Sequence, residues 1–562
     1  MKGKNELKVI LVAQNSSYTH TNAAVRILAC ALSPRHEAKI IETTVNAHGK
    51  ALEFAETLYA ENADIYAFSV YIWNRREQLG AARIIKQLLP ECAVVLGGPE
   101  VSYESEDFIE KNRFVDYLIR GEGEAAICDI ADGKYPRGSI VDGGIYDLFE
   151  ASSEPYYCNK YSSAQNYDGK LVYYESSRGC PYKCSYCLSS VKRPGEKVRS
   201  KPAELVEKEI GELMSHDIKA IKFVDRTFNF DRARTVRLFE YIMSSAEAKT
   251  QNGIYKGPMC HFEICAALLD DAVIEILSHA PRGLFRFEIG VQTVTPETLA
   301  AIGRKNDTEI ILENVRRLRE KTKVTVHLDL ICGLPLDTVD GIKKSFDSIY
   351  GMCDLLQMGF LKLLPGTALR LREEAEKYGM VWLEEPPYTL LCNSTVTFAE
   401  MRRLSVIADT VEKFSEADGG FKNTVDFMTS RADSAFDFYD ALGKYISGAG
   451  NISQRGLYKL LLDFGAEYFS LCGDGLKTLR EYLRLDFIIS NQGKPPIEIE
   501  RKYTETEIRI LSEIKRRVIR ETPKNSGEWF VPALEVHLFS FDEENAYVFD
   551  RKSRRCETRP LS

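Results

Sequence analysis

The chain has 562 residues, of which 44% are hydrophobic and 28% charged, and it carries a net charge of −8. This is ordinary globular composition, long enough for about three domains, and its acidic balance gives no reason to expect a nucleic-acid site. No apolar run reaches the roughly 18–20 residues of a membrane span, so we expect none.

The first part of the chain alternates strand and helix patterns. This alternation predicts an α/β fold, namely a Rossmann-like, doubly wound parallel sheet over residues 1–131. Ligands of such sheets lie at the carboxyl ends of the strands, where glycine lets the backbone come close. Strands are predicted at 7–14, 36–43, 63–71, 92–98 and 114–124, with helices such as 21–32 and 76–89 between them.

A segment of weak pattern, residues 132–170, is predicted to be a linker, because loop signals and isolated aromatic residues dominate it. A second alternation follows over residues 171–375, and its six strand–helix repeats predict a partial (β/α)6 barrel, whose chemistry lies at the carboxyl ends of the strands. The predicted strands are 171–177, 220–228, 261–267, 284–292, 324–333 and 355–364.

The strand rhythm stops after about residue 375. Residues 376–562 are predicted to form a separate, mostly helical domain, with helices near 400–416, 430–446, 454–469 and 505–519 and a β-hairpin at 535–550. We expect this domain to cap the barrel or to recognise the substrate.

Three cysteines fall within eight positions in the stretch "SSRGCPYKCSYCLSS", at Cys180, Cys184 and Cys187. Thiolates suit zinc or iron–sulfur centres. A zinc site needs a fourth ligand, and neither a second C-x-x-C nor a histidine at finger spacing is present. A four-iron cluster held by three cysteines leaves one iron open for a substrate or cofactor. Thiols kept free for metal also indicate a reducing compartment, the cytoplasm.

The spacing C-x3-C-x-Tyr-C resembles the cluster loop of the radical S-adenosylmethionine (radical SAM) superfamily, whose fold is a partial (β/α)6 barrel. The resemblance implies a [4Fe-4S] cluster on Cys180, Cys184 and Cys187, with SAM bound to the open iron and cleaved reductively to a 5′-deoxyadenosyl radical. It also implies an external electron donor of the flavodoxin or ferredoxin type. The alternative is a structural metal knuckle.

Other residues fit the same resemblance one at a time. "FEIGVQT" is similar to the family element that lines the SAM site, which implies cofactor-binding roles for Glu288 and Gln292; an ordinary half-buried strand is the alternative. Arg304 follows at the distance where related enzymes place an arginine near the SAM carboxylate, and such a fork suits a carboxylate. "FVDRTFN" is similar to the family's second-strand acidic element, but Arg226 replaces the second acid, so only Asp225 carries over.

The first domain resembles that of the cobalamin-binding class of radical SAM proteins. The likeness lies in "VVLGGPEVS", "YLIRGEGE" and "SVYIWN" (69–74), and it implies that strand-end loops hold the corrin over the barrel mouth. The D-x-H-x-x-G motif that supplies a cobalt ligand in other cobalamin proteins is absent, since "NAHGKA" lacks its Asp and final Gly. We therefore expect cobalamin without a histidine lower ligand. The implied corrin-binding residues are Gly97, Gly98, Pro99, Glu100, Gly121, Glu122 and Gly123.

Two other uses of the first domain stay open: a methylthiotransferase domain, which would need three further clustered cysteines, and a domain that binds no corrin. The leading hypothesis is a cobalamin-dependent radical SAM enzyme that methylates an unactivated carbon of an unknown small-molecule or peptide substrate. The alternatives are a cobalamin-dependent radical cyclase or rearrangement enzyme, and a cobalamin- or cluster-binding sensor without turnover.

Overall fold

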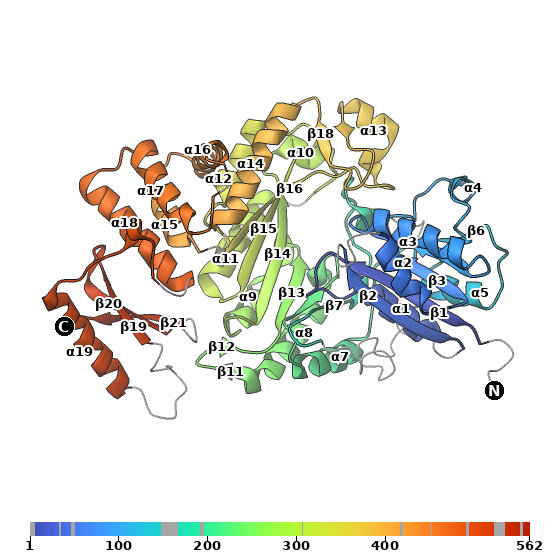
Figure 1. Cartoon of the computed structure of the whole chain (residues 1–562), viewed down its shortest axis with the longest axis horizontal. Helices are drawn as coiled ribbons and strands as arrows, with labels where there is room; N and C mark the ends of the chain where they lie inside the picture. Colours follow the sequence, from blue (N-terminus) through green and yellow to red (C-terminus); the bar gives the residue numbers. More distant parts are fainter. Residues whose placement is uncertain are drawn as a thin grey trace. The chain divides into compact units, whose positions relative to one another are not determined.

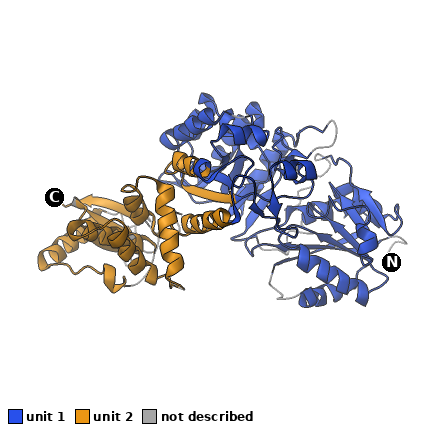
Figure 2. Ribbon diagram, turned by 90° about the horizontal axis from the view of Figure 1, so that it is seen from above, with its two compact units in different colours: residues 1–341, 360–398 blue, residues 342–359, 399–562 orange. Residues whose placement is uncertain are grey.

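The structure is a computed structural model, and it describes residues 6–32, 35–45, 51–147, 167–191, 196–305, 307–415, 420–450, 452–490, 494–521, 534–550 and 555–561. The chain forms two compact units (Figure 2). The first unit comprises residues 1–341 and 360–398, and the second comprises residues 342–359 and 399–562.

The first domain is a six-stranded sheet in the order β2-β1-β3-β4-β5-β6 (Figure 1). Every neighbouring pair is parallel, so the predicted Rossmann-like, doubly wound fold is confirmed. The order reverses direction between β1 and β3, and ligands of such folds bind outside the carboxyl ends of the strands beside this point. The strands are β1 (Lys8–Asn15), β2 (Glu37–Thr44), β3 (Ile65–Ser69), β4 (Ala93–Gly97), β5 (Tyr117–Arg120) and β6 (Ser139–Asp142).

Strand β6 lies inside the range predicted as a linker. It has four residues and pairs with β5 alone. An edge strand this short carries too little hydrophobic pattern to be recognised in the sequence. The helices of the domain are α1 (Ala23–Leu32), α2 (Ala51–Tyr59), α3 (Arg75–Leu88), α4 (Phe108–Lys111) and α5 (Glu124–Ala131).

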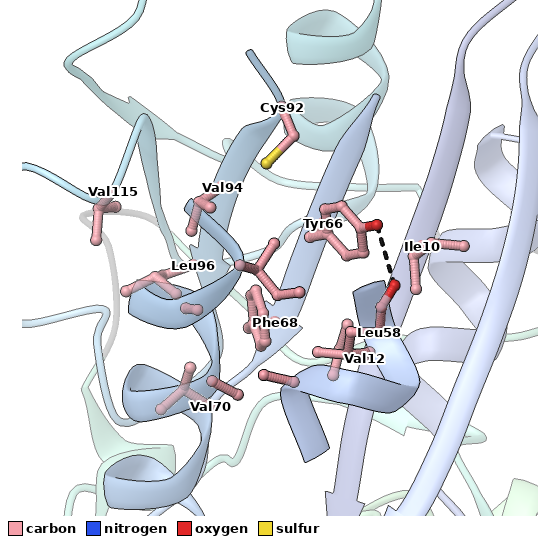
Figure 3. Close-up of a cluster of buried hydrophobic side chains, with 14 of the residues drawn as sticks. Ile10, Val12, Leu58, Tyr66, Phe68, Val70, Cys92, Val94, Leu96 and Val115 are labelled. Carbon is pink, nitrogen blue, oxygen red and sulfur yellow. Dashed lines mark hydrogen bonds between the residues drawn. The ribbon is translucent and has the colours of Figure 1, made fainter. Parts of the chain in front are cut away.

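Both faces of this sheet are buried, because alternate side chains of each strand enter different apolar clusters. In β1, Val9 and Leu11 enter one cluster, whereas Ile10 and Val12 enter the other. The strands therefore read as continuous apolar runs, as expected for a parallel sheet covered on both sides. Figure 3 shows the second cluster, in which the buried Tyr66 hydroxyl donates a hydrogen bond to the Leu58 carbonyl oxygen at 3.0 Å.

The carboxyl ends of β3 and β4 approach each other closely at Gly98. Its φ is +110°, and a Cβ there would lie 2.5 Å from the carbonyl oxygen of Val70. Glycine is therefore needed at this position for backbone conformation and for packing.

The barrel sheet has the order β16-β15-β14-β13-β10-β7, so its strands follow one another in sequence order. Pairing is parallel from β7 to β15, and the predicted partial barrel is confirmed. Its strands are β7 (Leu171–Tyr174), β10 (Ala220–Phe223), β13 (Met259–Ile264), β14 (Phe285–Gln292), β15 (Thr325–Cys332) and β16 (Leu355–Phe360). The helices that follow them are α7 (Ala203–Ser215), α8 (Arg232–Ala246), α9 (Asp271–Ser278), α10 (Pro296–Ala301), α11 (Thr308–Lys321), α12 (Val339–Ile349) and α13 (Arg372–Lys377).

The two faces of the barrel sheet differ in polarity. On β14, Phe285 and Phe287 are buried and pack against Phe239 of α8, so this face is the one that helices cover. The alternate residues Arg286 and Glu288 are half-buried on the opposite face. The barrel interior is therefore lined by polar groups.

The second unit is mostly helical, as predicted. The Asp347 carboxylate of α12 accepts hydrogen bonds from the Ser434 hydroxyl at 2.7 Å and from the Phe436 backbone amide at 2.9 Å. The tail predicted as a hairpin is a three-stranded antiparallel sheet of β19 (Leu534–Phe539), β20 (Asp542–Asp550) and β21 (Arg555–Pro560). The helices are α14 (Phe398–Ser415), α15 (Lys422–Thr429), α16 (Ala435–Gly448), α17 (Gly456–Tyr468), α18 (Gly473–Ser490) and α19 (Glu505–Glu521).

Among the helices in the described ranges, none combines the length and the apolar character required to cross a membrane.

Gly98→Ala should destabilise the first domain more than Gly133→Ala. Gly133 also has a positive φ, +74°, but a Cβ there would meet nothing within 4 Å, so its alanine costs only the left-handed strain of about 1–2 kcal/mol. Gly98→Ala adds the overlap with Val70, for about 1–3 kcal/mol more. Urea unfolding followed by circular dichroism measures both. Equal losses for the two variants would contradict the close approach.

Candidate functional site

The three clustered cysteines lie on one loop, residues 176–191, which follows β7 at the carboxyl edge of the barrel sheet; we call it the cysteine loop. It begins with β8 (Ser177–Arg178), which pairs antiparallel with β9 (Arg199–Ser200). Cys180 and Cys184 are 8% and 9% exposed, and Cys187 is half-buried. The three predicted metal ligands thus lie on one loop at the end of the barrel where chemistry is expected.

The donor set of this loop fits an iron–sulfur cluster, since three thiols are soft ligands. Burial raises the pKa of the Cys184 thiol, and the Arg304 guanidinium opposes that shift. A cation beside a thiol favours the thiolate that ligates iron. Among the described residues, no three His, Cys, Asp or Glu side chains are placed to share a single metal ion.

Asp225 anchors the base of the cysteine loop. Its carboxylate is 1% exposed and accepts hydrogen bonds from the Ser176 amide at 3.0 Å, from the Ser176 hydroxyl at 2.6 Å and from the Ser177 hydroxyl. Burial raises the pKa of Asp225, and these hydrogen bonds oppose the shift. The observed role of Asp225 is thus to hold the loop, and its assignment to the cofactor stays a prediction.

Thr227, two residues beyond Asp225, connects the same segment to the cysteines. Its hydroxyl donates to the carbonyl oxygen of Arg226 at 2.7 Å and lies 3.6 Å from the Cys180 sulfur. The Arg226 guanidinium is half exposed, and one of its nitrogens lies 3.6 Å from the Glu263 carboxylate on β13. Burial raises the pKa of Glu263, and Arg226 opposes the shift.

Gln292 is directed by an irregular strand end. The register of β14 against β15 shifts between Gly290 and Gln292, and Gln292 has a φ of +71°. A Cβ on Gly290 would lie 1.9 Å from the Gln292 side-chain nitrogen, so the glycine makes room for the amide. The Gln292 oxygen is buried and has no hydrogen-bond partner among the described residues. Such bulges re-aim side chains next to active sites, and an unpaired buried acceptor points to a ligand.

Arg304 connects Gln292's strand with the cysteine loop. Its guanidinium donates to the Gly290 carbonyl oxygen and, at 3.5 Å, to the Tyr186 hydroxyl. Arg304 therefore contacts both the end of β14, two residues before Gln292, and the cysteine loop, two residues after Cys184.

Glu288 lies within the barrel and is bound by two basic side chains. Its carboxylate lies 3.2 Å from the Lys222 ammonium and 2.9 Å from the His261 ring nitrogen. Burial opposes ionisation, yet the His261 hydrogen bond and Lys222 hold the pKa of Glu288 below its usual range. Its predicted role in binding SAM stays a prediction, because the observed partners are protein groups.

Sequence reasoning missed a polar row inside the barrel. Arg286 donates to the Nδ1 atom of His327 at 3.1 Å, and the Nε2 atom of His327 lies 3.1 Å from the Asp329 carboxylate. A guanidinium only donates, so Nδ1 is the acceptor and Nε2 carries the proton directed at Asp329. The alternation of polar residues along "VTVHLDLIC" and "LFRFEIGVQ" indicates one polar face on each strand. The sequence does not show whether the helices cover that face, so it does not place these residues inside the barrel.

The loop after β4 contains four of the predicted corrin-binding residues, Gly97 to Glu100. Glu100 is buried and accepts a hydrogen bond from the Tyr388 hydroxyl. A guanidinium nitrogen of Arg75 lies 3.4 Å from the Glu100 carboxylate and donates to the Glu100 carbonyl oxygen at 3.1 Å. Glu100 thus joins the first domain to the segment that follows the barrel.

The loop after β5 holds the other three predicted residues. Gly121 has a φ of +78° and Gly123 precedes α5 as its N-cap. Between them, the Glu122 carboxylate lies 2.9 Å from the Arg178 guanidinium and accepts from Arg199 at 3.2 Å. Burial opposes ionisation of Glu122, but the two arginines lower its pKa.

Aromatic side chains flank these loops after β3. The rings of Tyr71 and Trp73 stack with centroids 4.5 Å apart and an interplanar angle of 9°, and Trp73 is 44% exposed. His20, in the loop after β1, lies 3.3 Å from the Tyr173 hydroxyl and 3.2 Å from the Ser16 hydroxyl through its Nδ1 atom. The "NAHGK" segment, residues 46–50, lies outside the described residues.

Comparison with known proteins agrees with this architecture. Residues 174–349 match the radical SAM superfamily, residues 9–131 match the B12 binding domain, and residues 376–545 match a family described as a protein of unknown function, DUF4080. The chain therefore contains a radical SAM domain, preceded by a B12-binding domain and followed by a DUF4080 region.

A curated relative is the cobalamin-dependent radical SAM methyltransferase TokK of Streptomyces tokunonensis, which is 28% identical over 354 residues. The alignment covers 56% of this chain and 49% of TokK, so the chain spans about half the length of this relative.

Two solved structures share the fold. The radical SAM methyltransferase TsrM from Kitasatospora setae, with tryptophan and a SAM analogue bound, has a TM-score of 0.57 at 16% identity, covering 83% of this chain and 99% of TsrM. The cobalamin-dependent SAM radical enzyme OxsB, with aqua-cobalamin and SAM bound, has a TM-score of 0.57 at 13% identity, covering 93% of this chain and 82% of OxsB.

Asp225→Asn should loosen the cysteine loop. The amide keeps the shape of the side chain but replaces one acceptor oxygen with a donor, so a buried group at Ser176 or Ser177 loses its partner at a cost of about 1–3 kcal/mol. Hydrogen exchange of peptides covering the cysteine loop should accelerate. Asp231→Asn is the matched control, because Asp231 caps α8 and asparagine caps equally well. Unchanged exchange in Asp225→Asn would refute the anchoring role.

Proposed function

We propose that this protein is a cobalamin-dependent radical SAM enzyme that methylates an unactivated carbon of a substrate not yet identified. The observation that carries the proposal is the placement of Cys180, Cys184 and Cys187 on one anchored loop at the barrel mouth, in contact with the strand-end loops of a B12-binding domain. The methyltransferase activity of TokK, named above, supports the reaction class.

Cys180, Cys184 and Cys187 would hold a [4Fe-4S] cluster, and Gln292, Arg304 and the polar barrel interior would hold SAM. Arg304 offers a guanidinium suited to a carboxylate, and the unpartnered oxygen of Gln292 offers an acceptor. Tyr186 receives the Arg304 hydrogen bond, which fixes its ring beside the sulfurs.

When bound, the cluster and SAM supply a 5′-deoxyadenosyl radical, and cobalamin supplies the methyl group. The side chains do little covalent chemistry in such a site, since they bind, orient and exclude water. Asp225 and Thr227 hold the cysteine loop, while His327 and Lys222 keep the carboxylates of the barrel interior in fixed positions.

Cobalamin would lie at the carboxyl edge of the first sheet, near Gly97 to Glu100 and Gly121 to Gly123, without a histidine lower ligand. Two observations support this arrangement. The exposed ring of Trp73, which stacks on the half-buried Tyr71, offers a flat aromatic surface beside these loops, and aromatic rings pack face to face with other flat π-systems. The His20 ring is engaged with Tyr173 and Ser16, and burial lowers its pKa.

The substrate, a small molecule or a peptide, would be selected with help from the C-terminal region, residues 376–562. An external flavodoxin- or ferredoxin-type donor would supply electrons. Product analysis decides the reaction: gain of a CH2 unit supports methylation, whereas loss of hydrogens would indicate a cyclase.

Cys184→Ser should abolish cluster binding. Anaerobically reconstituted wild-type protein should contain about four iron atoms per chain and release 5′-deoxyadenosine from SAM under reduction, and the variant should lose both properties. Cys472→Ser is the control, because Cys472 is exposed in the second unit. Wild-type protein that binds zinc alone, or that holds iron without cleaving SAM, would refute the proposal.

Bound cob(II)alamin should give an electron paramagnetic resonance spectrum without nitrogen superhyperfine splitting from a histidine, because no histidine would ligate cobalt; splitting from the benzimidazole base of cobalamin itself would not depend on any residue of the chain. His20→Ala should leave that spectrum unchanged. Nitrogen splitting that disappears in His20→Ala would show that His20 is the lower ligand and would contradict this part of the proposal.

A further inference from the structure

Arg178, two residues before Cys180, is the centre of a group of ion pairs. Its Nε and Nη2 atoms donate to the two carboxylate oxygens of Glu175 at 2.9 and 2.8 Å. Nη2 also donates to Glu124 at 2.7 Å, and Nη1 lies 2.9 Å from Glu122. All three nitrogens of the guanidinium therefore contact carboxylates, and the pair with Glu175 has the fork geometry that arginine forms and lysine cannot.

The partners of Arg178 come from two domains. Glu175 follows β7 of the barrel, whereas Glu122 and Glu124 lie in the loop after β5 and at the start of α5. The Arg178 side chain is 19% exposed, and those of Glu122 and Glu124 are 16% and 7% exposed. Ion pairs this shielded from water are screened little by salt, and removal of one partner leaves a buried charge uncompensated.

Arg199 strengthens the same connection. It is the cross-strand neighbour of Arg178 in the β8–β9 ribbon, and it donates to Glu122 at 3.2 Å and to the Tyr146 carbonyl oxygen at 2.6 Å. The Tyr146 amide donates back to Glu122 at 2.7 Å. Both arginines of the ribbon thus bind one glutamate of the first domain.

The backbone on each side of these contacts is constrained. Gly179, between Arg178 and Cys180, has a φ of +100°, so the turn that leads to the first cysteine is fixed. A Cβ on Gly143 would lie 1.6 Å from the Glu122 carbonyl oxygen, so the loop after β5 is packed against β6. The ion pairs therefore connect two segments whose own shapes are defined.

We propose that Arg178 is a positioning residue, which fixes the cysteine loop against the loop after β5 and so sets the placement of the cluster relative to the cobalamin side of the site. The effect on cluster placement rests on the proposed function. The ion pairs that connect the two loops do not depend on it. Glu122 and Glu124 then act by holding the barrel loop, and Glu122, predicted to bind the corrin, has its carboxylate occupied by protein partners.

The first test measures the connection without cofactors. In Arg178→Met, hydrogen exchange of peptides covering the cysteine loop and the loop after β5 should accelerate at least about tenfold, because local opening loses buried ion pairs. Peptides of β14 should exchange as in the wild type. Arg237→Met is the matched control: Arg237 also binds two glutamates, Glu204 at 2.7 Å and Glu207 at 2.6 Å, but on the exposed surface between α7 and α8.

The second test measures the consequence in reconstituted protein that contains iron and cobalamin, given SAM and titanium(III) citrate and no other substrate. Methylation of the bound cobalamin should fall at least about tenfold in Arg178→Met, since small misplacements of reacting groups are costly. 5′-Deoxyadenosine formation per mole of protein should change less. Loss of folded protein alone would lower cobalamin methylation and 5′-deoxyadenosine formation in the same proportion. A fall in the ratio of methylation to 5′-deoxyadenosine formation would therefore indicate a positioning effect.

Two further variants keep the inference falsifiable if Arg178→Met folds poorly. Glu124→Gln removes the charge of one partner and should accelerate hydrogen exchange of the two loops by a smaller factor. The exchange rates of Arg178→Lys should lie between those of Arg178→Met and the wild type. Unchanged exchange of both loops in all three variants would overturn the inference. If the wild type binds no cobalamin, the proposed function fails, while the exchange measurement still decides whether Arg178 connects the two loops.

Discussion

The cysteine loop depends on buried electrostatic anchors, because strand pairing holds it only through the two residues of β8 at its start, as far as the described residues show. Asp225 accepts three hydrogen bonds at its base, and Arg178 binds carboxylates from both domains at its entry. A metal centre needs its ligands held in place before the metal arrives if binding is not to cost ordering entropy. Asp225 and Arg178 therefore hold the cysteine loop in place before metal binds, which the cysteines alone would not do.

The barrel and the first domain serve this site in different ways. The barrel sheet buries a cluster of phenylalanines on the face that helices cover and turns its polar residues inward, so its inner face is lined by polar side chains. The first sheet buries both faces and leaves its strand-end loops as the part free for function. Glu100 and Glu122 in those loops are bound by Tyr388 and by Arg178 and Arg199. The loops predicted to hold the corrin are thus also the loops that join the two domains.

Two neighbouring glutamates of the barrel, Glu288 and Glu263, have pKa values shifted in opposite directions. Glu288 is held ionised by Lys222 and His261, and its pKa is lowered. Glu263, its direct neighbour across the strands, lies 3.6 Å from the Arg226 guanidinium, and burial raises its pKa although Arg226 and Lys222 oppose the shift. The pKa values of these two paired glutamates therefore shift in opposite directions because different cations lie beside them.

The sequence by itself determined the order and type of the main elements, the doubly wound sheet, the partial barrel and the three cysteines, because periodicity and ligand spacing are local properties. It also singled out Arg304, which the fold places against the cysteine loop through Tyr186. It did not reveal β6, the third strand of the tail, or the polar row of Arg286, His327 and Asp329. Only the tertiary structure decided that Asp225, Glu100 and Glu122 bind protein groups. The partner of a carboxylate depends on which loops are adjacent in the folded chain, and a local sequence pattern contains no information on that.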